Sequence, residues 1–339
     1  MGFARVMLDV EGLELNSEDK EVILHPNVGG VILFSRNFAN LEQLQELVRE
    51  IKSCKPNILV SVDQEGGRVQ RLKDEFSKLP PLREFGKIFD KNEDEGLTVA
   101  YNIAWLMATE VLSVGIDFSF APVLDLDLGL SGIIGDRAFH SNPEKASIIA
   151  KFYIKGMNAA GMKAIGKHFP GHGSVAPDSH LELPEDTRPL HEIANKDLMP
   201  FKNMINEGLD AIMPAHIVYT QVDSKPACFS KVWLKQLLRD ELNFKGAVLS
   251  DDLSMQGASI IGSHLERAEV ALANGCDMVL VCNDRENAVK VIEGLGDVNS
   301  RESSIRLQQL RGSKVLTFKE LIESPRWLAA SAMLKKYFK

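Results

Sequence analysis

The densest group of chemically active residues in the chain is the segment KHFPGHGSVAPDSH, residues 167–180. It places three histidines, a lysine and an aspartate among two glycines and two prolines. Such a set suits a metal site, a phosphate-binding loop or proton transfer to and from a substrate. The rest of the chain has to decide among these three.

The first two interpretations fit the segment poorly. His168 and His172 have the i, i+4 spacing that puts two metal ligands on one face of a helix. The intervening residues include Pro170 and Gly171, so a regular helix interior is excluded there. The phosphate-binding order G-x-x-x-x-G-K-[ST] is absent. The residues therefore disfavour a metal site and a phosphate-binding loop in this segment.

Proton transfer is the remaining interpretation. Asp178 and His180 are two positions apart, so in an extended segment their side chains point to the same side. A carboxylate beside an imidazole orients the ring and favours its protonated form. Asp and Ser are also common in surface turns, and the segment alone leaves that alternative open.

A second acidic segment is VLSDDLSM, residues 248–255. Successive side chains of a strand face opposite ways, so we expect one of Asp251 and Asp252 to face a site and the other to brace a loop. A carboxylate opposite a His/Asp pair is a nucleophile facing a general acid. That arrangement suits a two-step displacement at a sugar acetal.

Short apolar runs that alternate with helical patterns predict the scaffold. Helical patterns separate these runs. Residues 190–208 are predicted to form one helix, and Ser17 is predicted to be the N-cap of another. The predicted strands are 5–12, 29–35, 57–64, 117–127, 163–169, 211–217, 246–253 and 276–283.

Eight strands alternating with helices predict an α/β fold, a (β/α)₈ TIM-type barrel. A doubly wound open sheet is the alternative, weakened because no G-x-G-x-x-G follows the first strand. We expect one catalytic domain over residues 1–339, with helices at roughly 300–339 packing on it.

Polar residues at the ends of the predicted strands meet the demand that a barrel makes. Catalytic groups of such barrels lie at the C-terminal ends of strands or just after them. Charged groups in apolar strands are costly without partners, and six at equivalent ends predict a site. These residues are Asp9, Asp63, Asp125, His168, His216 and Asp251.

Composition limits the class of protein. The 339 residues carry a net charge of −8 and no block of Lys or Arg, which argues against a nucleic-acid partner. No stretch is apolar enough to span a bilayer, and the N-terminus lacks a signal-peptide pattern, so we expect no membrane and a cytoplasmic location. The four cysteines are scattered and read as thiols. No obligate protein partner is evident.

Four motifs carry a resemblance to a known family: the 167–180 segment, SVDQEGGRVQR (61–71), GDRAF (135–139) and LSDDLSM (249–255). With them the chain resembles glycoside hydrolase family 3 over nearly its whole length. It is most similar to the single-domain bacterial β-N-acetylglucosaminidases of peptidoglycan recycling. The resemblance implies a retaining hydrolase acting on muropeptides, in which N-acetylglucosamine is β-1,4-linked to anhydro-N-acetylmuramic acid bearing a peptide. With this resemblance we expect neither a metal nor an organic cofactor.

The resemblance also implies residue roles. Asp251 would be the nucleophile, His180 the proton donor and acceptor, and Asp178 the group that orients and tunes His180. His172 would shape the loop without being a catalyst. The N-acetylglucosamine would be held by Asp63, Arg71, Arg137, Lys167 and His168.

Three rival functions stay open at this point. In a substrate-assisted hexosaminidase, the acetamido oxygen attacks and a pair such as Asp251–Asp252 polarises it. In a β-N-acetylglucosaminide phosphorylase, phosphate replaces water in the second step, and a histidine repels phosphate less than a glutamate does. A non-catalytic sugar sensor on the same scaffold would bind sugar without turnover.

Overall fold

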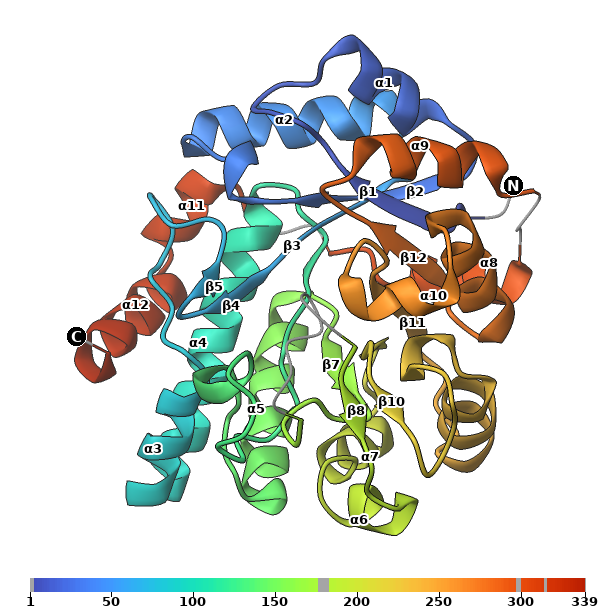
Figure 1. The fold of residues 1–339 in the computed structure, drawn as a ribbon. Coiled ribbons are helices and arrows are strands. Elements are labelled where there is room, and N and C mark those ends of the chain that lie inside the picture. Colours follow the sequence, from blue (N-terminus) through green and yellow to red (C-terminus); the bar gives the residue numbers. More distant parts are fainter. Residues whose placement is uncertain (1–2, 176–182, 297–299, 314–315, 339) are drawn as a thin grey trace.

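The computed structural model describes residues 3–175, 183–296, 300–313 and 316–338 (Figure 1). Within these ranges a parallel sheet of eight strands forms the centre, in the order β6-β3-β2-β1-β12-β11-β9-β7. The strands are β1 (Val6–Asp9), β2 (Val28–Leu33), β3 (Leu59–Val62), β6 (Phe118–Ser119), β7 (Ile165–Phe169), β9 (Ala211–Pro214), β11 (Ala247–Asp252) and β12 (Met278–Val281).

The sheet curls into a nearly closed barrel. Beyond the end of β6, the chain continues alongside β7: the Ile165 amide donates to the Ala121 carbonyl at 2.7 Å, and the Leu124 amide to the Lys167 carbonyl at 2.7 Å. A parallel bridge joins Val123 to Lys167 at the same place. Neighbouring strands follow one another in chain order around the ring, whereas a doubly wound sheet reverses its order. The prediction of a (β/α)₈ TIM-type barrel is confirmed, with all eight strands.

Helices surround the barrel, as Figure 1 shows. Those between or after the strands are α1 (Ser17–Leu24), α2 (Leu41–Cys54), α3 (Arg83–Lys91), α4 (Glu93–Ser113), α5 (Pro143–Ala160), α6 (Leu190–Asn195), α7 (Met199–Asn206), the π-helix η4 (Val232–Glu241), α8 (His264–Asn274), α9 (Arg285–Gly294) and α10 (Arg301–Gln308). Helix α5 ends at Gly161, which adopts the left-handed φ of 93° that is common for glycine after the last helical residue.

Two helix predictions were wrong in detail. Residues 190–208 form two helices, α6 and α7, because Pro200 has no amide hydrogen to donate inside one continuous helix. In the first turn of α7 that missing donor breaks no hydrogen bond. The N-cap of α1 is Asn16 and not Ser17: the Asn16 side chain accepts from the Asp19 amide at 2.8 Å.

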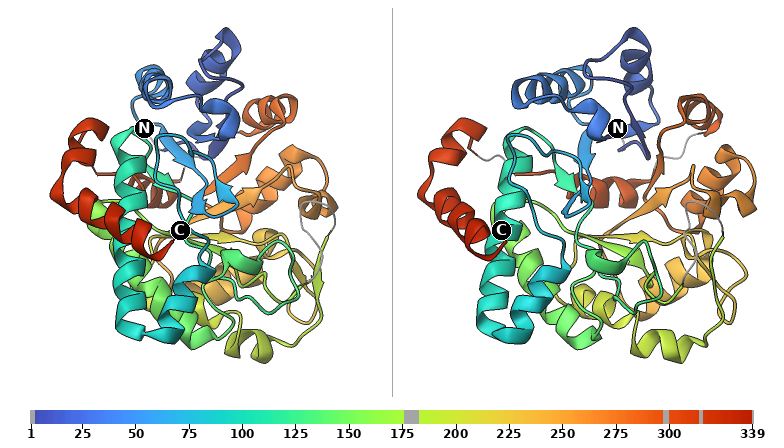
Figure 2. Two further views of the ribbon diagram at one scale, coloured as in Figure 1. Left: turned by 90° about the vertical axis from the view of Figure 1, so that its left-hand side faces the viewer. Right: turned by 60° about the vertical axis from the view of Figure 1, so that its left-hand side comes forward.

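The last helices pack on the outside of the barrel wall. The two views of Figure 2 show α11 (Phe318–Glu323) and α12 (Pro325–Tyr337) against α4. Trp327 of α12 donates its indole N–H to the buried Glu110 carboxylate of α4 at 2.8 Å. This contact ties the chain's end to the helix layer.

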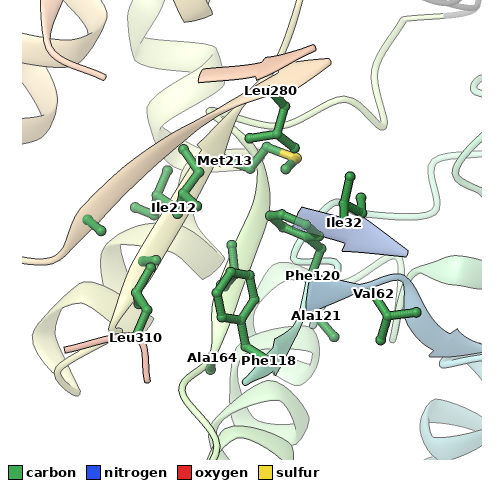
Figure 3. Packing of buried hydrophobic residues seen from close by; sticks show 14 of the residues in the cluster. Ile32, Val62, Phe118, Phe120, Ala121, Ala164, Ile212, Met213, Leu280 and Leu310 are labelled. Atoms are coloured by element: carbon green, nitrogen blue, oxygen red, sulfur yellow. The ribbon is translucent and has the colours of Figure 1, made fainter. Parts of the chain in front are cut away.

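The barrel interior is filled by apolar side chains from several strands (Figure 3). The rings of Phe118 and Phe120 meet edge to face at 5.3 Å between centroids. Phe120 also lies with Ile32, Met213 and Leu280 in the wall of the cavity described below. The uppermost layer of the core is therefore the floor of the site.

The cysteines are free thiols, three of them buried and Cys54 half-buried. Among the described residues, no helix is long and apolar enough to cross a membrane.

Candidate active site

A cavity of about 400 Å³ opens at the C-terminal ends of the strands. It is lined by three of the six predicted strand-end residues, Asp63, His168 and Asp251. Three further predicted residues, Arg71, Arg137 and Lys167, line the same cavity. Most of the predicted site residues are thus neighbours in space, although they come from four separate stretches of the chain.

The other three strand-end residues lie outside the lining. Asp9 pairs with Arg36 and accepts from the Asn283 amide at 3.2 Å. Asp125 is buried beneath the cavity, and His216 is fully buried with its Nε2 3.0 Å from the Asp252 carbonyl oxygen. These groups support the strand ends that carry the cavity.

The sugar-binding set predicted from the resemblance forms a network of alternating charge. Lys167, from β7, places its ammonium 2.9 Å from Asp63 Oδ1 at the end of β3 and 2.6 Å from Glu65 Oε1. Arg137, from the short helix η2 (Gly135–Arg137), donates from Nε and from a terminal nitrogen to the two Glu65 oxygens at 2.9 and 2.8 Å. Arg71 lies at the rim, 3.5 Å from Asp63 Oδ2.

The network keeps its members ionised. Burial by itself raises the pKa of Glu65, but Arg137 and Lys167 outweigh it and hold that pKa well below its usual range. Burial by itself lowers the pKa of Lys167, but Asp63 and Glu65 raise it above its usual value. Both lysine and arginine are therefore cations that can donate to hydroxyl oxygens of a bound ligand.

His168 is oriented by Asp125. Its Nδ1 is 2.7 Å from Asp125 Oδ2, and the same carboxylate accepts from the His172 amide at 2.7 Å. Because Nδ1 faces a carboxylate, it carries the hydrogen, and Nε2 is the ring atom left for other partners. One buried aspartate therefore fixes both a cavity histidine and the backbone that follows β7.

His172 also lines the cavity, with its ring 5.9 Å from that of His168. Burial, and to a smaller degree the neighbouring His168, lower its pKa to about 4. The His172 ring is therefore neutral near pH 7.

Asp251 and Asp252, at the end of β11, are both among the residues that line the cavity. The pairing of β11 with β12 is irregular between Leu249 and Asp252, which breaks the strict alternation of side chains. The bracing role expected of one of them falls to Asp252, whose carboxylate accepts from the Ser254 and Cys282 amides at 3.0 Å each. Burial raises the pKa of Asp252 to about 7.

Glu65 also lines the cavity, although it was not among the residues predicted for the site. It belongs to β4 (Gln64–Gly66), which pairs with β5 (Val69–Gln70) in a hairpin directly after β3. The one feature of the sequence that could have pointed to Glu65 is its place, as a carboxylate, within the motif SVDQEGGRVQR. No residue pattern indicates that the hairpin turns this side chain toward Arg137 and Lys167.

Asp178 and His180, the predicted acid–base pair, lie outside the described residues. Within the described ranges, no group of three or more His, Cys, Asp or Glu side chains is arranged to hold a metal ion.

The chain is similar to known proteins over nearly its whole length. Residues 5–323 match the Glycosyl hydrolase family 3 N terminal domain. A beta-hexosaminidase of Thioalkalivibrio sulfidiphilus is 50% identical over 335 residues, covering 98% of this chain and 96% of that protein. One from Idiomarina loihiensis is 51% identical over 334 residues, covering 98% of this chain and 100% of that protein.

The same relationship is seen in three dimensions. NagZ from Neisseria gonorrhoeae, solved in complex with N-trifluoroacetyl-D-glucosamine, superposes with a TM-score of 0.94 at 43% identity. The match covers 100% of this chain and 99% of that one.

The barrel fold, the family match over residues 5–323 and the similarity to NagZ together identify a carbohydrate-processing enzyme, a glycoside hydrolase. The chain belongs to glycosyl hydrolase family 3, and within it groups with the beta-hexosaminidases.

Proposed function

We propose that the enzyme is a retaining exo-β-N-acetylglucosaminidase that removes terminal β-linked N-acetylglucosamine from muropeptides. The observation that carries the proposal is the position of Asp251, which lines a cavity of about 400 Å³ together with the cations Arg137 and Lys167. The beta-hexosaminidase relatives and the N-acetylglucosamine analogue bound by the Neisseria NagZ support the choice of sugar.

In the first step, the Asp251 carboxylate attacks the anomeric carbon while the bond to the leaving oxygen breaks. The leaving oxygen takes a proton from His180, which Asp178 orients; both roles rest on the sequence resemblance. The transition state resembles an oxocarbenium ion, so a carboxylate below the ring stabilises it. In the second step, His180 takes a proton from water, the water oxygen bonds to the anomeric carbon, and Asp251 is released.

The charged network binds the sugar in this proposal. Asp63 accepts hydrogen bonds from sugar hydroxyls, and its side chain is 18% exposed. The hydroxyl oxygens are acceptors for three donors, Arg71, Arg137 and Lys167, and His168 bonds through Nε2. The apolar floor, with Phe120 and Met213, excludes water beneath the reacting carbon.

The substrate class follows from the family resemblance. The preferred substrate is a muropeptide fragment of cell-wall recycling, with N-acetylglucosamine linked to anhydro-N-acetylmuramic acid, and the expected location is the cytoplasm. The cavity accommodates a terminal sugar, which agrees with release from a chain end.

Product analysis tests this function. The purified enzyme is incubated with an aryl β-N-acetylglucosaminide and, separately, with the anhydromuropeptide, and the first-formed sugar is followed by proton NMR. We expect β-N-acetylglucosamine before mutarotation. The α-anomer as first product would exclude a retaining mechanism, and failure to cleave either compound would exclude the substrate. A sugar 1-phosphate in phosphate buffer would show a phosphorylase.

A substrate-assisted mechanism is the second candidate, because Asp252 lines the cavity beside Asp251. There the acetamido oxygen, and not Asp251, forms the bond to the anomeric carbon. Replacing the acetyl group by trifluoroacetyl weakens that oxygen as a nucleophile. A steep fall in kcat across mono-, di- and trifluoroacetyl substrates would favour this mechanism, and a shallow one favours attack by Asp251.

A further inference from the structure

The buried carboxylate of Glu65 touches two of the cations that the proposed function assigns to sugar binding. We propose that Glu65 is a positioning residue that fixes Arg137 and Lys167 for the sugar without contacting the sugar itself. The proposal rests on the proposed function, in which those two cations donate to sugar hydroxyls. Glu65 would thus affect sugar binding only through Arg137 and Lys167.

The hydrogen bonds of Glu65 leave little room for any other role. Its two oxygens accept three charge-assisted bonds, from Arg137 at 2.9 and 2.8 Å and from Lys167 at 2.6 Å. Its side chain is 2% exposed, against 18% for Asp63. Of the two carboxylates that Lys167 contacts, Asp63 is therefore the one with access to a ligand.

The bidentate contact sets the plane of the Arg137 guanidinium. One terminal nitrogen of Arg137 donates to the Ile133 carbonyl at 3.0 Å, so three of its five N–H groups are held within the described residues. Lys167 is held in the same way between Asp63 and Glu65. Such fixed donors lose little freedom when a sugar binds.

Local backbone structure places Glu65 at this point. Gly66 and Gly67 follow it with φ of 110° and 55°. A Cβ at Gly66 would meet the Pro80 carbonyl oxygen at 2.3 Å, and one at Gly67 would meet Pro81 Cβ at 2.8 Å. Only glycines allow the hairpin to turn this tightly against residues 79–81, which explains the spacing E-G-G after the strand.

Charge balance predicts a pH signature. The groups that face the Lys167 ammonium are Asp63 from β3, Glu65 from β4 and the like charge of Arg137 from η2. With Glu65 neutral, Asp63 alone offsets two cations, and burial then lowers the pKa of Lys167. In the proposed mechanism the proton donor His180 sets the alkaline limb of kcat/KM in the wild type. The lysine of the variant loses its proton at lower pH, and this second ionisation displaces the limb to lower pH.

The test is Glu65→Gln, measured with an aryl β-N-acetylglucosaminide from pH 5 to 10. We expect kcat/KM to fall about 100-fold, as for misplaced binding groups, with its alkaline limb displaced to lower pH. Glu110→Gln is the matched control: Glu110 is equally buried but bonds Ser77 and Trp327 outside the barrel. It should change stability and leave both kcat/KM and the pH profile as in the wild type.

A second variant keeps the test decisive if Glu65→Gln does not fold. Glu65→Asp retains the negative charge but moves it away from Arg137 and Lys167 by the length of one methylene group. We therefore expect kcat/KM to fall while the alkaline limb of its pH profile stays in place. A wild-type kcat/KM per folded molecule in either variant would overturn the proposal, as would an unmoved alkaline limb in Glu65→Gln. Failure of the wild-type enzyme to cleave the substrate would instead count against the proposed function.

Discussion

Two buried carboxylates at opposite ends of the barrel are each paired with two basic side chains. Glu65 at the C-terminal mouth binds Arg137 and Lys167. Asp277, just before β12 at the N-terminal end, binds Arg239 and Arg306 at 3.0 Å each. Both are almost wholly buried. Burial and ion pairing alone therefore do not tell a site from a structural support.

The difference lies in what the surrounding donors contact. At the N-terminal end the Asp277 carboxylate also accepts from the Val248 amide at 2.9 Å and the Ser303 hydroxyl at 2.7 Å. Arg239 also donates to the Phe244 carbonyl at 2.9 Å, so the cluster joins strand ends to α10 and η4. A concavity of about 680 Å³ lies beside this cluster, larger than the one at the mouth.

In this barrel, the volume of a cavity therefore does not by itself identify the active site. At the mouth, the cations line a cavity that is also lined by Asp251, the proposed nucleophile. At the other end, Arg239 bonds two backbone carbonyls and Asp277, and Arg306 pairs with the carboxylates of Asp277 and Glu302. Barrel enzymes in general keep catalysis at the first end and stability at the second.

The largest expected effect is at the mouth. Asp251→Ala removes the proposed nucleophile, and kcat should fall by about 10⁴-fold, the scale for losing one member of a catalytic group. The thermal midpoint should stay close to that of the wild type. Azide should restore turnover of an aryl glycoside and give an α-glycosyl azide, since it enters the space of the missing carboxylate. Residual activity above a tenth of the wild type would remove Asp251 from the mechanism.

Asp277→Asn should have the opposite effect to Asp251→Ala, with lower stability and unchanged activity. Because it leaves two guanidinium groups without their carboxylate, unfolding free energy should drop by about 3–5 kcal/mol in urea titrations. The kcat/KM of the folded fraction should match that of the wild type. A variant that keeps its stability and loses activity would contradict the division between the two ends.

Asp252→Asn sharpens the account of the mouth through its pH dependence. The pKa of Asp252 is about 7 in the folded chain, above the unfolded value of about 3.9, so folding disfavours the ionised form. Wild-type stability therefore falls as pH rises between these values, and the asparagine removes that loss. The midpoint of the variant relative to the wild type should rise from pH 4 to pH 8 in calorimetry.

The same variant separates the two mechanisms. If Asp251 is the nucleophile, Asp252→Asn keeps most of its activity, because the amide oxygen can still accept from Ser254 and Cys282. Loss of activity as large as in Asp251→Ala would favour the substrate-assisted mechanism.

The smallest expected effect is at His172. Its pKa of about 4 lies below the unfolded value of about 6.5, so its contribution to stability is complete above pH 6.5 and is lost as pH falls toward 4. His172→Asn should therefore show a shallower decline in thermal midpoint from pH 7 to pH 4 than the wild type. An equal slope in both proteins would show that His172 titrates normally.

Sequence patterns predicted the barrel because its strands are short apolar runs, and their polar ends marked the mouth. The patterns did not predict that β11 pairs irregularly with β12 between Leu249 and Asp252, because that pairing depends on the register of the closed barrel. Glu65 escaped notice because its partners come from 72 and 102 positions away, a pairing set by the closed barrel. The sugar-binding set came from the family resemblance, and its assigned roles stay predictions.

The central claim is that Asp251 forms a covalent bond to the sugar. A 5-fluoro N-acetylglucosaminyl fluoride slows the second step, so the wild-type enzyme should accumulate a glycosyl adduct. Peptide mass mapping should then locate that adduct on the peptide that contains Asp251. Rapid turnover of an aryl N-acetylglucosaminide with no adduct, or an adduct on another residue, would contradict the account.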